Sequence, residues 1–315
     1  MNARFGFIPK RLLAAIPLLI GVVLLVFLIL QVTPGDPARL VVGLRASDAE
    51  LALARERLGL DDPVIVQFLH YLGGVFTGDL GYSFKSDQPV AAIIAGRLPV
   101  SLWLLGTAAV LSVAISFVVA SLAARRPDGV FDHASRAAGL VMFAMPSFWI
   151  GILLILLVAL PTGWFPVGGF GYTPAEQARS IVLPAITLAA AIAPLQIRSL
   201  RASLIQVRRA EYVTSARALG ISPRRTASRF VLRNALVPTV SMLALNIGYM
   251  LFGAVVVETT FALPGLGEGI VLAARARDIP LIQGYTLVFA VAVVVVFLVA
   301  DIVNALLDPR VKVSS

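Results

Sequence analysis

The stretch RRAEYVTSARALGISPRRTASRFVLRN, residues 208–234, decides how this chain is arranged. It contains seven arginines and a single acidic residue, Glu211, in a chain that is 59% hydrophobic. Each arginine costs about 3 kcal/mol at the centre of a bilayer, so burying the stretch in lipid would cost on the order of 20 kcal/mol. The stretch must therefore lie in water, between apolar segments that are able to cross a membrane.

The composition of the whole chain is that of a membrane protein. Its mean hydropathy is +0.92 and 14% of its residues are charged, whereas charged residues make up about a quarter of a soluble domain. We therefore expect an all-α integral membrane protein. The net charge of +9 does not indicate a nucleic-acid partner, because basic residues also collect on the cytoplasmic side of membrane proteins. The chain has no cysteine, which excludes disulfides and thiolate chemistry.

Six apolar segments are long enough to cross about 30 Å of hydrocarbon as helices. The first is twice too long for the apolar part of a signal peptide, and TPGDP follows it in place of a small-residue cleavage site. We therefore interpret it as a retained span. The predicted spans are residues 12–32, 99–124, 137–160, 180–206, 235–257 and 279–302.

The basic residues of the connecting segments predict the orientation. The two ends of the chain, 125–136 and 198–234 together hold 17 Lys and Arg, and the short segments 161–179 and 258–278 hold three. Because cytoplasmic loops carry the excess of Lys and Arg, we expect both termini in the cytoplasm of a multi-pass cell-membrane protein. The predicted cytoplasmic segments are 1–11, 125–136, 207–234 and 303–315, and the external ones are 33–98, 161–179 and 258–278.

The long external loop, 33–98, is predicted to contain short helices. Ser47 and Glu50 have the spacing of a capping box, and Gly59 suits the end of the helix that follows. A second helix begins after Asp62, with Pro63 in its first turn.

The sequence offers no catalytic, cofactor or metal site. The two histidines, His70 and His133, fall in loops on opposite sides of the membrane, and neither HExxH nor GxxxxGK[ST] occurs. We therefore expect a non-catalytic protein without a cofactor; if it uses ATP, another chain binds the nucleotide. No span core carries an ionisable residue, which disfavours a proton- or ion-coupled secondary transporter.

The basic stretch also contains residues that are typical of the end of one helix and the start of another. Glu211 to Leu219 is predicted to form a short helix that Gly220 stops, and Ser222 and Pro223 suit the cap and first position of the next helix. A topology signal alone explains the arginines but not this pattern. We interpret the short helix as a docking element for a soluble partner, with small residues for close approach, apolar anchors and an arginine for a carboxylate. Its residues are Glu211, Tyr212, Val213, Thr214, Ser215, Ala216, Arg217, Leu219 and Gly220.

The segment EYVTSARALGISPRRTASRFVLRNALVP, residues 211–238, resembles the cytoplasmic "EAA…G" loop of ABC importer permeases, in its peptide-permease version. Further segments agree with that family in order along the whole chain. They are TPGDP at 33–37, ERLGLDDP at 56–63, GDLGYS at 78–83, FDH at 131–133, MPSFW at 145–149, ETTFALPGLG at 258–267 and DPR at 308–310. The loop and ETTFALPGLG are the most specific of these.

One position departs from the family pattern. Aligned on Gly220, the Glu-Ala-Ala of the general family falls on Thr214, Ser215 and Ala216. An ion pair made by that glutamate in other importers is therefore not carried over to this chain.

The resemblance implies a transmembrane subunit of a binding-protein-dependent importer in the lipid bilayer. Its implied partners are a second, similar permease, two ATP-binding subunits that hydrolyse ATP, and an external binding protein that delivers a di- or oligopeptide. Relatives of this family carry nickel, glutathione or oligosaccharides, so these substrates stay open. A channel or secondary transporter outside the ABC class is the remaining alternative.

Two further groups of residues are candidates for the transport route. Polar residues in the fourth and fifth spans are candidates for its lining, although such residues also form hydrogen bonds between helices; they are Thr187, Gln196, Ser241, Asn246 and Tyr249. The segment 258–270 is predicted to form a re-entrant turn at the outer mouth, with a plain connecting loop as the alternative. The mouth candidates are Glu258, Thr259, Phe261, Pro264, Gly265 and Gly267.

Overall fold

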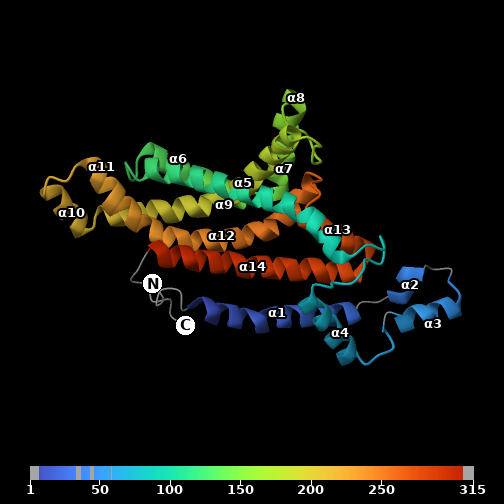
Figure 1. The fold of residues 1–315 in the computed structure, drawn as a ribbon. Helices are drawn as coiled ribbons and strands as arrows, with labels where there is room; N and C mark the ends of the chain where they lie inside the picture. The colour runs from blue at the N-terminus through green and yellow to red at the C-terminus, as the bar shows by residue number, and fades with distance from the viewer. Residues whose placement is uncertain (1–6, 33–36, 43–45, 58, 308–315) are drawn as a thin grey trace. The chain divides into compact units, whose positions relative to one another are not determined.

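A computed structural model describes residues 7–32, 37–42, 46–57 and 59–307, and its regular secondary structure there is helical apart from one isolated bridge between Tyr82 and Pro89 (Figure 1). The elements are α1 (Phe7–Val32), α2 (Pro37–Val42), α3 (Asp48–Arg57), α4 (Val64–Thr77), α5 (Val90–Ala123), α6 (Val130–Ala144), α7 (Ser147–Leu154), η1 (Ile155–Ala159), α8 (Leu160–Thr162), α9 (Pro174–Arg208), α10 (Glu211–Ala218), α11 (Pro223–Arg225), η2 (Thr226–Leu232), α12 (Arg233–Thr260), α13 (Leu266–Ala276) and α14 (Ile279–Leu307). The motifs at 33–36 and 308–310 and both chain ends lie outside the described residues.

Several helices have the length and apolar character that a bilayer requires. Within the described residues, α1, α5, α9 and α14 are each long and apolar enough to cross a membrane. They overlap four of the predicted spans, and α12 overlaps a further one, although its searched apolar part, Leu245–Thr260, is shorter. The chain is therefore an all-helical protein of the kind that is embedded in a membrane. The number of six spans stays a prediction.

The helix expected over 137–160 is broken in the structure. α6 and the run Ser147–Thr162 form a pair bent by 102°. The break has a local cause: Pro146 cannot donate an N–H, and the residue before a proline is driven into extended backbone. Met145 has φ −82° and ψ 128°, as this rule requires. Two helices thus replace the single one expected, and the pair counts as one crossing only if both parts lie within the bilayer.

Some helices begin earlier than the apolar pattern indicates. α9 begins at Pro174, because Thr173 and Glu176 form a capping box in which each side chain accepts a hydrogen bond from the other residue's backbone. α5 begins at Val90, inside the segment predicted as external loop. Hydropathy alone does not indicate either of these two helix starts.

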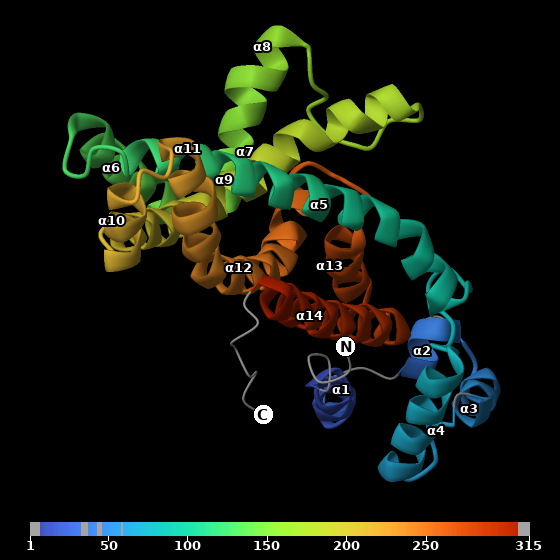
Figure 2. The same cartoon turned by 60° about the vertical axis from the view of Figure 1, so that its left-hand side comes forward.

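The described chain divides into two compact units. The first comprises Met1–Arg11, Leu102–Leu263 and Val293–Ser315, and the second comprises Leu12–Ser101 and Pro264–Ala292. In the first unit, α9 packs against α12, α6 and α7 (Figure 2). Ala185, Ala189 and Ala193, one helical turn apart, are buried along α9. Such small residues allow the close helix approach that is typical of packing in membranes.

In the second unit, the beginning of α5 packs with α13 and α14. Val90 and Ile94 of α5, Leu266 of α13 and Tyr285 of α14 belong to one buried cluster. α13 is an 11-residue helix in the segment that was predicted to be a re-entrant turn or a loop. Its start is capped from a distance, because the Ser101 hydroxyl accepts a 2.7 Å hydrogen bond from the Leu266 N–H.

Two carboxylates fix the helices of this second unit. Glu268 on α13 pairs with Arg97 on α5 at 3.0 Å. Asp278 is buried and caps α14: its carboxylate accepts hydrogen bonds from the Leu281 N–H at the helix start and from the Ser83 hydroxyl, far away in sequence. Both contacts join segments that are far apart in the sequence, so they fix the positions of α5, α13 and α14 relative to one another.

The external-loop helices follow their local signals. The Ser47 hydroxyl accepts a hydrogen bond from the Glu50 N–H, and the Glu50 carboxylate accepts one from the Ser47 N–H at 2.8 Å. This is the predicted capping box at the start of α3, and the hydrogen bonds from Ser47 hold the pKa of Glu50 below its usual value. Gly59 has the expected positive φ of 64°. α4 begins at Val64, directly after Pro63.

Replacing Gly269 by alanine is expected to destabilise the second unit. A Cβ at Gly269 would lie 2.3 Å from the hydroxyl oxygen of Tyr285, a fully buried residue. Overpacking of this kind costs about 1–3 kcal/mol. The measurement is the thermal unfolding midpoint of the full chain in detergent. Gly96→Ala is the matched control, because nothing lies within 4 Å of its Cβ; equal midpoints for the two variants would contradict the packing described.

Candidate functional site

The candidate site is the α10 helix and the turn that follows it. α10 spans Glu211–Ala218, and Gly220 has a φ of 73°. The Ile221 N–H donates to the Ala216 carbonyl at 3.1 Å and the Gly220 N–H to the Arg217 carbonyl at 3.0 Å. These two bonds form a Schellman motif, which ends a helix where glycine supplies the left-handed residue. The predicted stop at Gly220 is therefore confirmed.

After this turn the chain enters a second helical run, as the sequence predicts. Ser222 is the cap residue and Pro223 the first residue of α11. The run continues through η2, a π-helical stretch from Thr226 to Leu232, into α12. Stretches of π-helix are uncommon and are frequent at functional sites. α10 is thus joined to α12 by a single tight turn.

One face of α10 belongs to the hydrophobic core. Val213 is fully buried, and Ala216 is buried one turn further on. Val213 packs in a cluster with residues from the ends of four other elements. Those residues are Ala120 and Ala124 of α5 and the segment after it, Leu200 and Leu204 of α9, Val231 of η2 and Ala235 of α12. A displacement of α10 therefore acts on the ends of α5, α9 and α12 together.

Two residues of α10 do not face outward as the docking interpretation requires. Val213 was expected among the apolar anchors for a partner, and Ala216 among the small residues for close approach. Both side chains point into the chain's own core. On a helix of eight residues, apolar residues occur on two faces, and the pattern alone does not show which face the rest of the chain covers.

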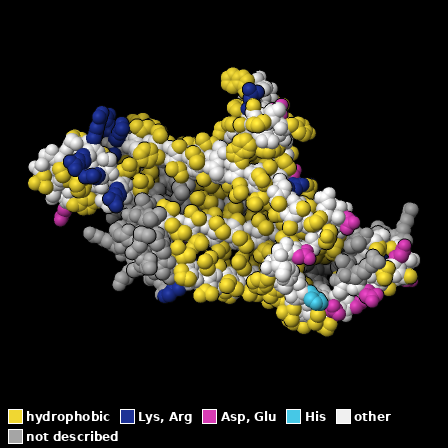
Figure 3. Space-filling model, viewed as in Figure 1, with side chains coloured by type: hydrophobic (Ala, Val, Ile, Leu, Met, Phe, Trp, Pro, Cys, Tyr) yellow, Lys and Arg dark blue, Asp and Glu magenta, His cyan; other side chains and the backbone are white. Residues whose placement is uncertain are grey.

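The opposite face of α10 is open. The Tyr212 side chain is 44% exposed and that of Leu219 is 80% exposed. Glu211, Thr214, Ser215, Arg217 and Gly220 are also exposed. Basic side chains, all of them arginines in this stretch, gather over α10 and α11 in the space-filling view (Figure 3). The exposed face therefore combines two large apolar side chains with a basic surround, which is the composition of a protein–protein contact.

Hydrogen bonds between the neighbouring helix ends also hold the segment around α10 in place. The Arg208 guanidinium donates to the Ala124 carbonyl at 2.6 Å, joining the end of α9 to the residue that follows α5. The Ser203 hydroxyl donates to the Ala235 carbonyl at 3.0 Å, joining α9 to α12. The ends of α5, α9 and α12 next to α10 are thus joined by hydrogen bonds as well as by apolar packing.

A buried ion pair that no sequence pattern indicates lies in the same unit. Asp132 on α6 has no exposed side-chain surface, and both of its oxygens accept hydrogen bonds from the Arg201 guanidinium on α9. The Asp128 N–H donates to the same carboxylate at 2.8 Å. A two-pronged pair of this kind fixes the angle between two helices as well as their distance.

Replacing Gly220 by valine is expected to destabilise the α10 turn by about 1–2 kcal/mol, because a side chain disfavours the left-handed conformation. Nothing lies within 4 Å of a Cβ built there, so the loss comes from the backbone alone. Asparagine tolerates this conformation, and Gly220→Asn should therefore lose clearly less. Thermal unfolding of the full chain measures both; equal losses would show that the positive φ is not what matters at this position.

The candidate pathway residues do not share one environment. Thr187, Gln196 and Asn246 are buried within the first unit. The Gln196 carbonyl oxygen accepts a 3.0 Å hydrogen bond from Ser116, and the Thr187 hydroxyl donates to its own helix. Tyr249 is exposed, and the side chain of Ser241 lies outside those described. Contacts within the chain thus account for Thr187 and for the oxygen of Gln196, whereas Tyr249 is open to a neighbour.

The outer-mouth candidates are divided between the two units. Glu258 and Phe261 are buried in the first unit, where the Phe261 carbonyl accepts a hydrogen bond from the Gly169 N–H at 2.8 Å. Thr259 is exposed. Pro264, Gly265 and Gly267 belong to the second unit, at the start of α13. A role at an outer mouth stays a prediction for all six.

These features describe a membrane-embedded helical protein whose most basic loop presents a small, rigidly mounted helix. Residues 116–313 match the model of a family described as binding-protein-dependent transport system inner membrane component. Residues 4–105 match a second model, which is described as the N-terminal part of the membrane component of such systems. The chain belongs to this family, the transmembrane permeases of ABC importers, so a non-ABC channel or secondary transporter is not favoured.

Two curated permeases and one solved structure are among the proteins that are similar to this chain. The glutathione transport system permease protein GsiC of Escherichia coli O6:H1 is 38% identical over 98% of this chain and 99% of its own length. The oligopeptide transport system permease protein AppB of Bacillus subtilis is 36% identical over the same shares. Among solved structures, a chain of an amino acid ABC transporter crystallised with histidines aligns at 16% identity with a TM-score of 0.48, over 70% of this chain and 94% of that one.

Proposed function

We propose that this protein is the permease subunit through which an ABC importer moves di- or oligopeptides into the cell. A second, similar permease completes the route, two ATP-binding subunits supply the energy, and an external binding protein delivers the peptide. The proposal rests on the arrangement of α10. Val213 packs its inner face into the core, and its outer face exposes Tyr212 and Leu219.

The proposed coupling is mechanical. An ATP-binding subunit holds the exposed face of α10 and moves when it closes on ATP and opens after hydrolysis. The core around Val213 transmits that motion to the adjoining ends of α5, α9 and α12. Tightly packed interiors deform little, so a partner that prefers one position of α10 selects one arrangement of these helices.

The proposal includes a topology. Six spans place both termini and α10 in the cytoplasm, and the segments 33–98, 161–179 and 258–278 outside. The excess of Lys and Arg supports this orientation. It also requires the bent α6–α7 pair to count as one crossing. In this orientation α3, α4 and α13 face the binding protein.

Glutathione is the second candidate substrate. It is itself a tripeptide, and a relative named as a glutathione permease aligns over nearly the whole chain. Nickel has less support, since neither His70 nor His133 lies in a predicted span.

Reconstituted transport tests the proposed function. The full chain, its second permease, the two ATP-binding subunits and the binding protein are assembled in proteoliposomes. We expect ATP-dependent uptake of labelled di- to pentapeptides, with glutathione and nickel as the comparison substrates. Uptake of nickel but not of peptides would contradict the proposal, and ATP-independent uptake would contradict the coupling.

A further inference from the structure

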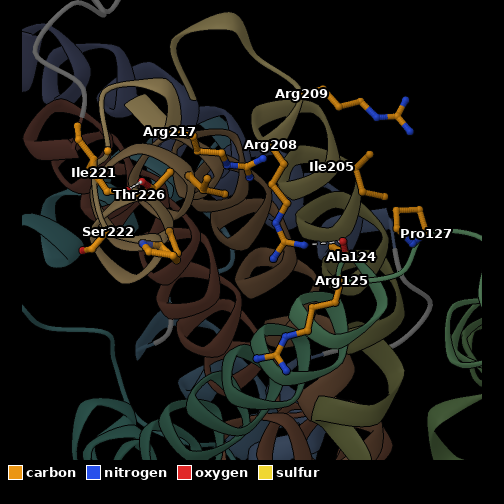
Figure 4. A pocket seen from close by; sticks show the side chains of 14 residues that line it. Ala124, Arg125, Pro127, Ile205, Arg208, Arg209, Arg217, Ile221, Ser222 and Thr226 are labelled. Atoms are coloured by element: carbon orange, nitrogen blue, oxygen red, sulfur yellow. Dashed lines mark hydrogen bonds between the residues drawn. The ribbon is translucent and has the colours of Figure 1, made fainter. Parts of the chain in front are cut away.

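Two cavities of the protein differ in their charge. The cavity beside α10 is lined by arginines and by Arg217, Gly220 and Ile221 of the α10 turn, so it belongs to the contact proposed for the ATP-binding subunits (Figure 4). Another cavity, of about 240 Å³, lies wholly in the second unit. Its walls come mainly from the end of α1, the turn before α4, α4 itself and the start of α14. No Asp, Glu, Lys or Arg among the described residues lines it.

Two buried polar groups of this second-unit cavity lack a partner in the described part of the chain. The Tyr71 hydroxyl on α4 is buried and makes no hydrogen bond there. The Gln283 side chain on α14 is only 9% exposed, and no hydrogen bond joins it to another described residue. Both residues also line a smaller neighbouring pocket, so the two side chains lie close together. Buried polar groups without a partner are unfavourable, which indicates that a ligand pairs with them.

The frame around these groups is held by contacts of its own. The Gln67 amide on α4 donates to two main-chain carbonyls of the turn before α4, at 2.9 and 3.1 Å. Its oxygen accepts a 2.8 Å hydrogen bond from Gln31 at the end of α1. Phe27 of α1 packs against Phe68 of α4, with their ring centroids 5.5 Å apart. The shape of the cavity is therefore set before a ligand enters, which lowers the entropy cost of binding.

The chemistry of the cavity favours a neutral ligand with an amide group. An ion would lose its hydration there without a charged partner inside the cavity, and His70 lies at the exposed rim. Burial raises the pKa of Tyr71 to about 12, so the hydroxyl stays protonated at neutral pH and is able to donate. The Gln283 amide offers a donor and an acceptor side by side. An amide group matches this pair with two parallel hydrogen bonds.

We propose that this cavity binds a neutral peptide amide through Tyr71 and Gln283. Its volume is below the range of about 300–1,000 Å³ that is typical of sites for drug-sized ligands, so one peptide residue is the expected occupant. Phe84 and Ile279 offer apolar wall to the side chain of that residue. The amide belongs either to a free peptide or to a loop of the external binding protein, because α4 lies in the segment predicted to be external.

Titration of the full chain in detergent with N-acetyl-leucinamide, followed by ligand-observed NMR, tests the site. N-acetyl-leucine, which has a carboxylate in place of the terminal amide, should bind roughly tenfold more weakly. Tyr71→Phe and Gln283→Met should each weaken binding of N-acetyl-leucinamide by about fivefold, the contribution of one hydrogen bond. The matched controls are Tyr82→Phe and Gln88→Met, which make the same changes at exposed positions of the same unit outside the cavity. They should leave the affinity unchanged.

The thermal unfolding midpoint of the ligand-free variants separates a ligand site from a structural role. Tyr71→Phe and Gln283→Met should leave the midpoint unchanged or raise it, because each removes a buried polar group that has no partner. A lower midpoint for both variants would overturn the proposal, because it would show that the two groups stabilise the fold itself. Equal affinity for the two ligands, or equal losses in the cavity and control variants, would also overturn it.

Added binding protein identifies the source of the amide. Displacement of N-acetyl-leucinamide by the peptide-free binding protein would support an amide site that is occupied by a loop of that protein. Undiminished binding in its presence would support a site for a free peptide. None of these measurements requires the ATP-binding subunits, so this proposal and the coupling through α10 fail separately.

Discussion

Replacing Asp132 by alanine is expected to lower the free energy of unfolding by about 3–5 kcal/mol, because it leaves the partner of a buried ion pair uncompensated. Arg201 would keep its charge with only 17% of its side chain exposed. The Asp128 N–H would also lose its acceptor. The thermal unfolding midpoint of the full chain in detergent should fall by on the order of 10 °C.

Asp128→Asn is the matched control for this prediction, because Asp128 has a positive φ of 61° that asparagine also tolerates. Asp128 lies in the same segment and pairs with Arg136 at 3.4 Å, but 77% of its side chain is exposed. Exposed pairs contribute about 0–1 kcal/mol. Asp132→Leu combined with Arg201→Met should recover much of the loss, because apolar residues of similar volume replace buried ion pairs well. If Asp132→Ala and Asp128→Asn shift the midpoint equally, the buried pair does not hold α6 to α9.

Leu219→Asp is expected to weaken binding of the ATP-binding subunits by about 2 kcal/mol or more, which is roughly thirtyfold in affinity. The reason is that the variant places a charge in the centre of the proposed contact. Because Leu219 is 80% exposed, the variant should keep the unfolding midpoint of the unaltered chain. ATP-driven uptake should fall to background, and a binding titration with the purified ATP-binding subunits measures the affinity.

The control for Leu219→Asp makes the same chemical change elsewhere. Leu53 on α3 is 50% exposed and lies in the segment predicted to be external. Leu53→Asp should leave the affinity for the ATP-binding subunits unchanged. Equal weakening by both variants would mean that the exposed face of α10 is not the specific contact.

The elements that the sequence predicted well are those with local signals. The capping box of Ser47 and Glu50, the stop at Gly220 and the restart at Ser222 and Pro223 are each contained in a few neighbouring residues. Such signals act through backbone hydrogen bonds within one turn and need no knowledge of the rest of the fold. The long helices follow from apolar length alone.

The features that the sequence did not reveal depend on distant contacts. Asp132 and Arg201 are 69 residues apart, and Ser83 and Asp278 are 195 residues apart. No local pattern marks such pairs. The burial of Val213 is a property of the same kind, because the cluster that covers it is assembled from separate helices. The pattern of helix ends and the family resemblance both predict a docking role for α10, but neither indicates which of its faces is free.

The most direct test of the account is cross-linking from α10 in the assembled importer. The chain has no cysteine, so the Leu219→Cys variant has a single thiol. The comparison is Tyr172→Cys, because Tyr172 is 98% exposed and lies in a segment that is predicted to be external. In intact cells a membrane-impermeant thiol reagent should label Tyr172→Cys alone. In the isolated complex a short bifunctional reagent should join Leu219→Cys alone to an ATP-binding subunit. Labelling of Leu219→Cys from outside, or the absence of a cross-link from it in an active complex, would contradict the central claim. That claim is that the ATP-binding subunit contacts α10 and moves it during the ATP hydrolysis cycle.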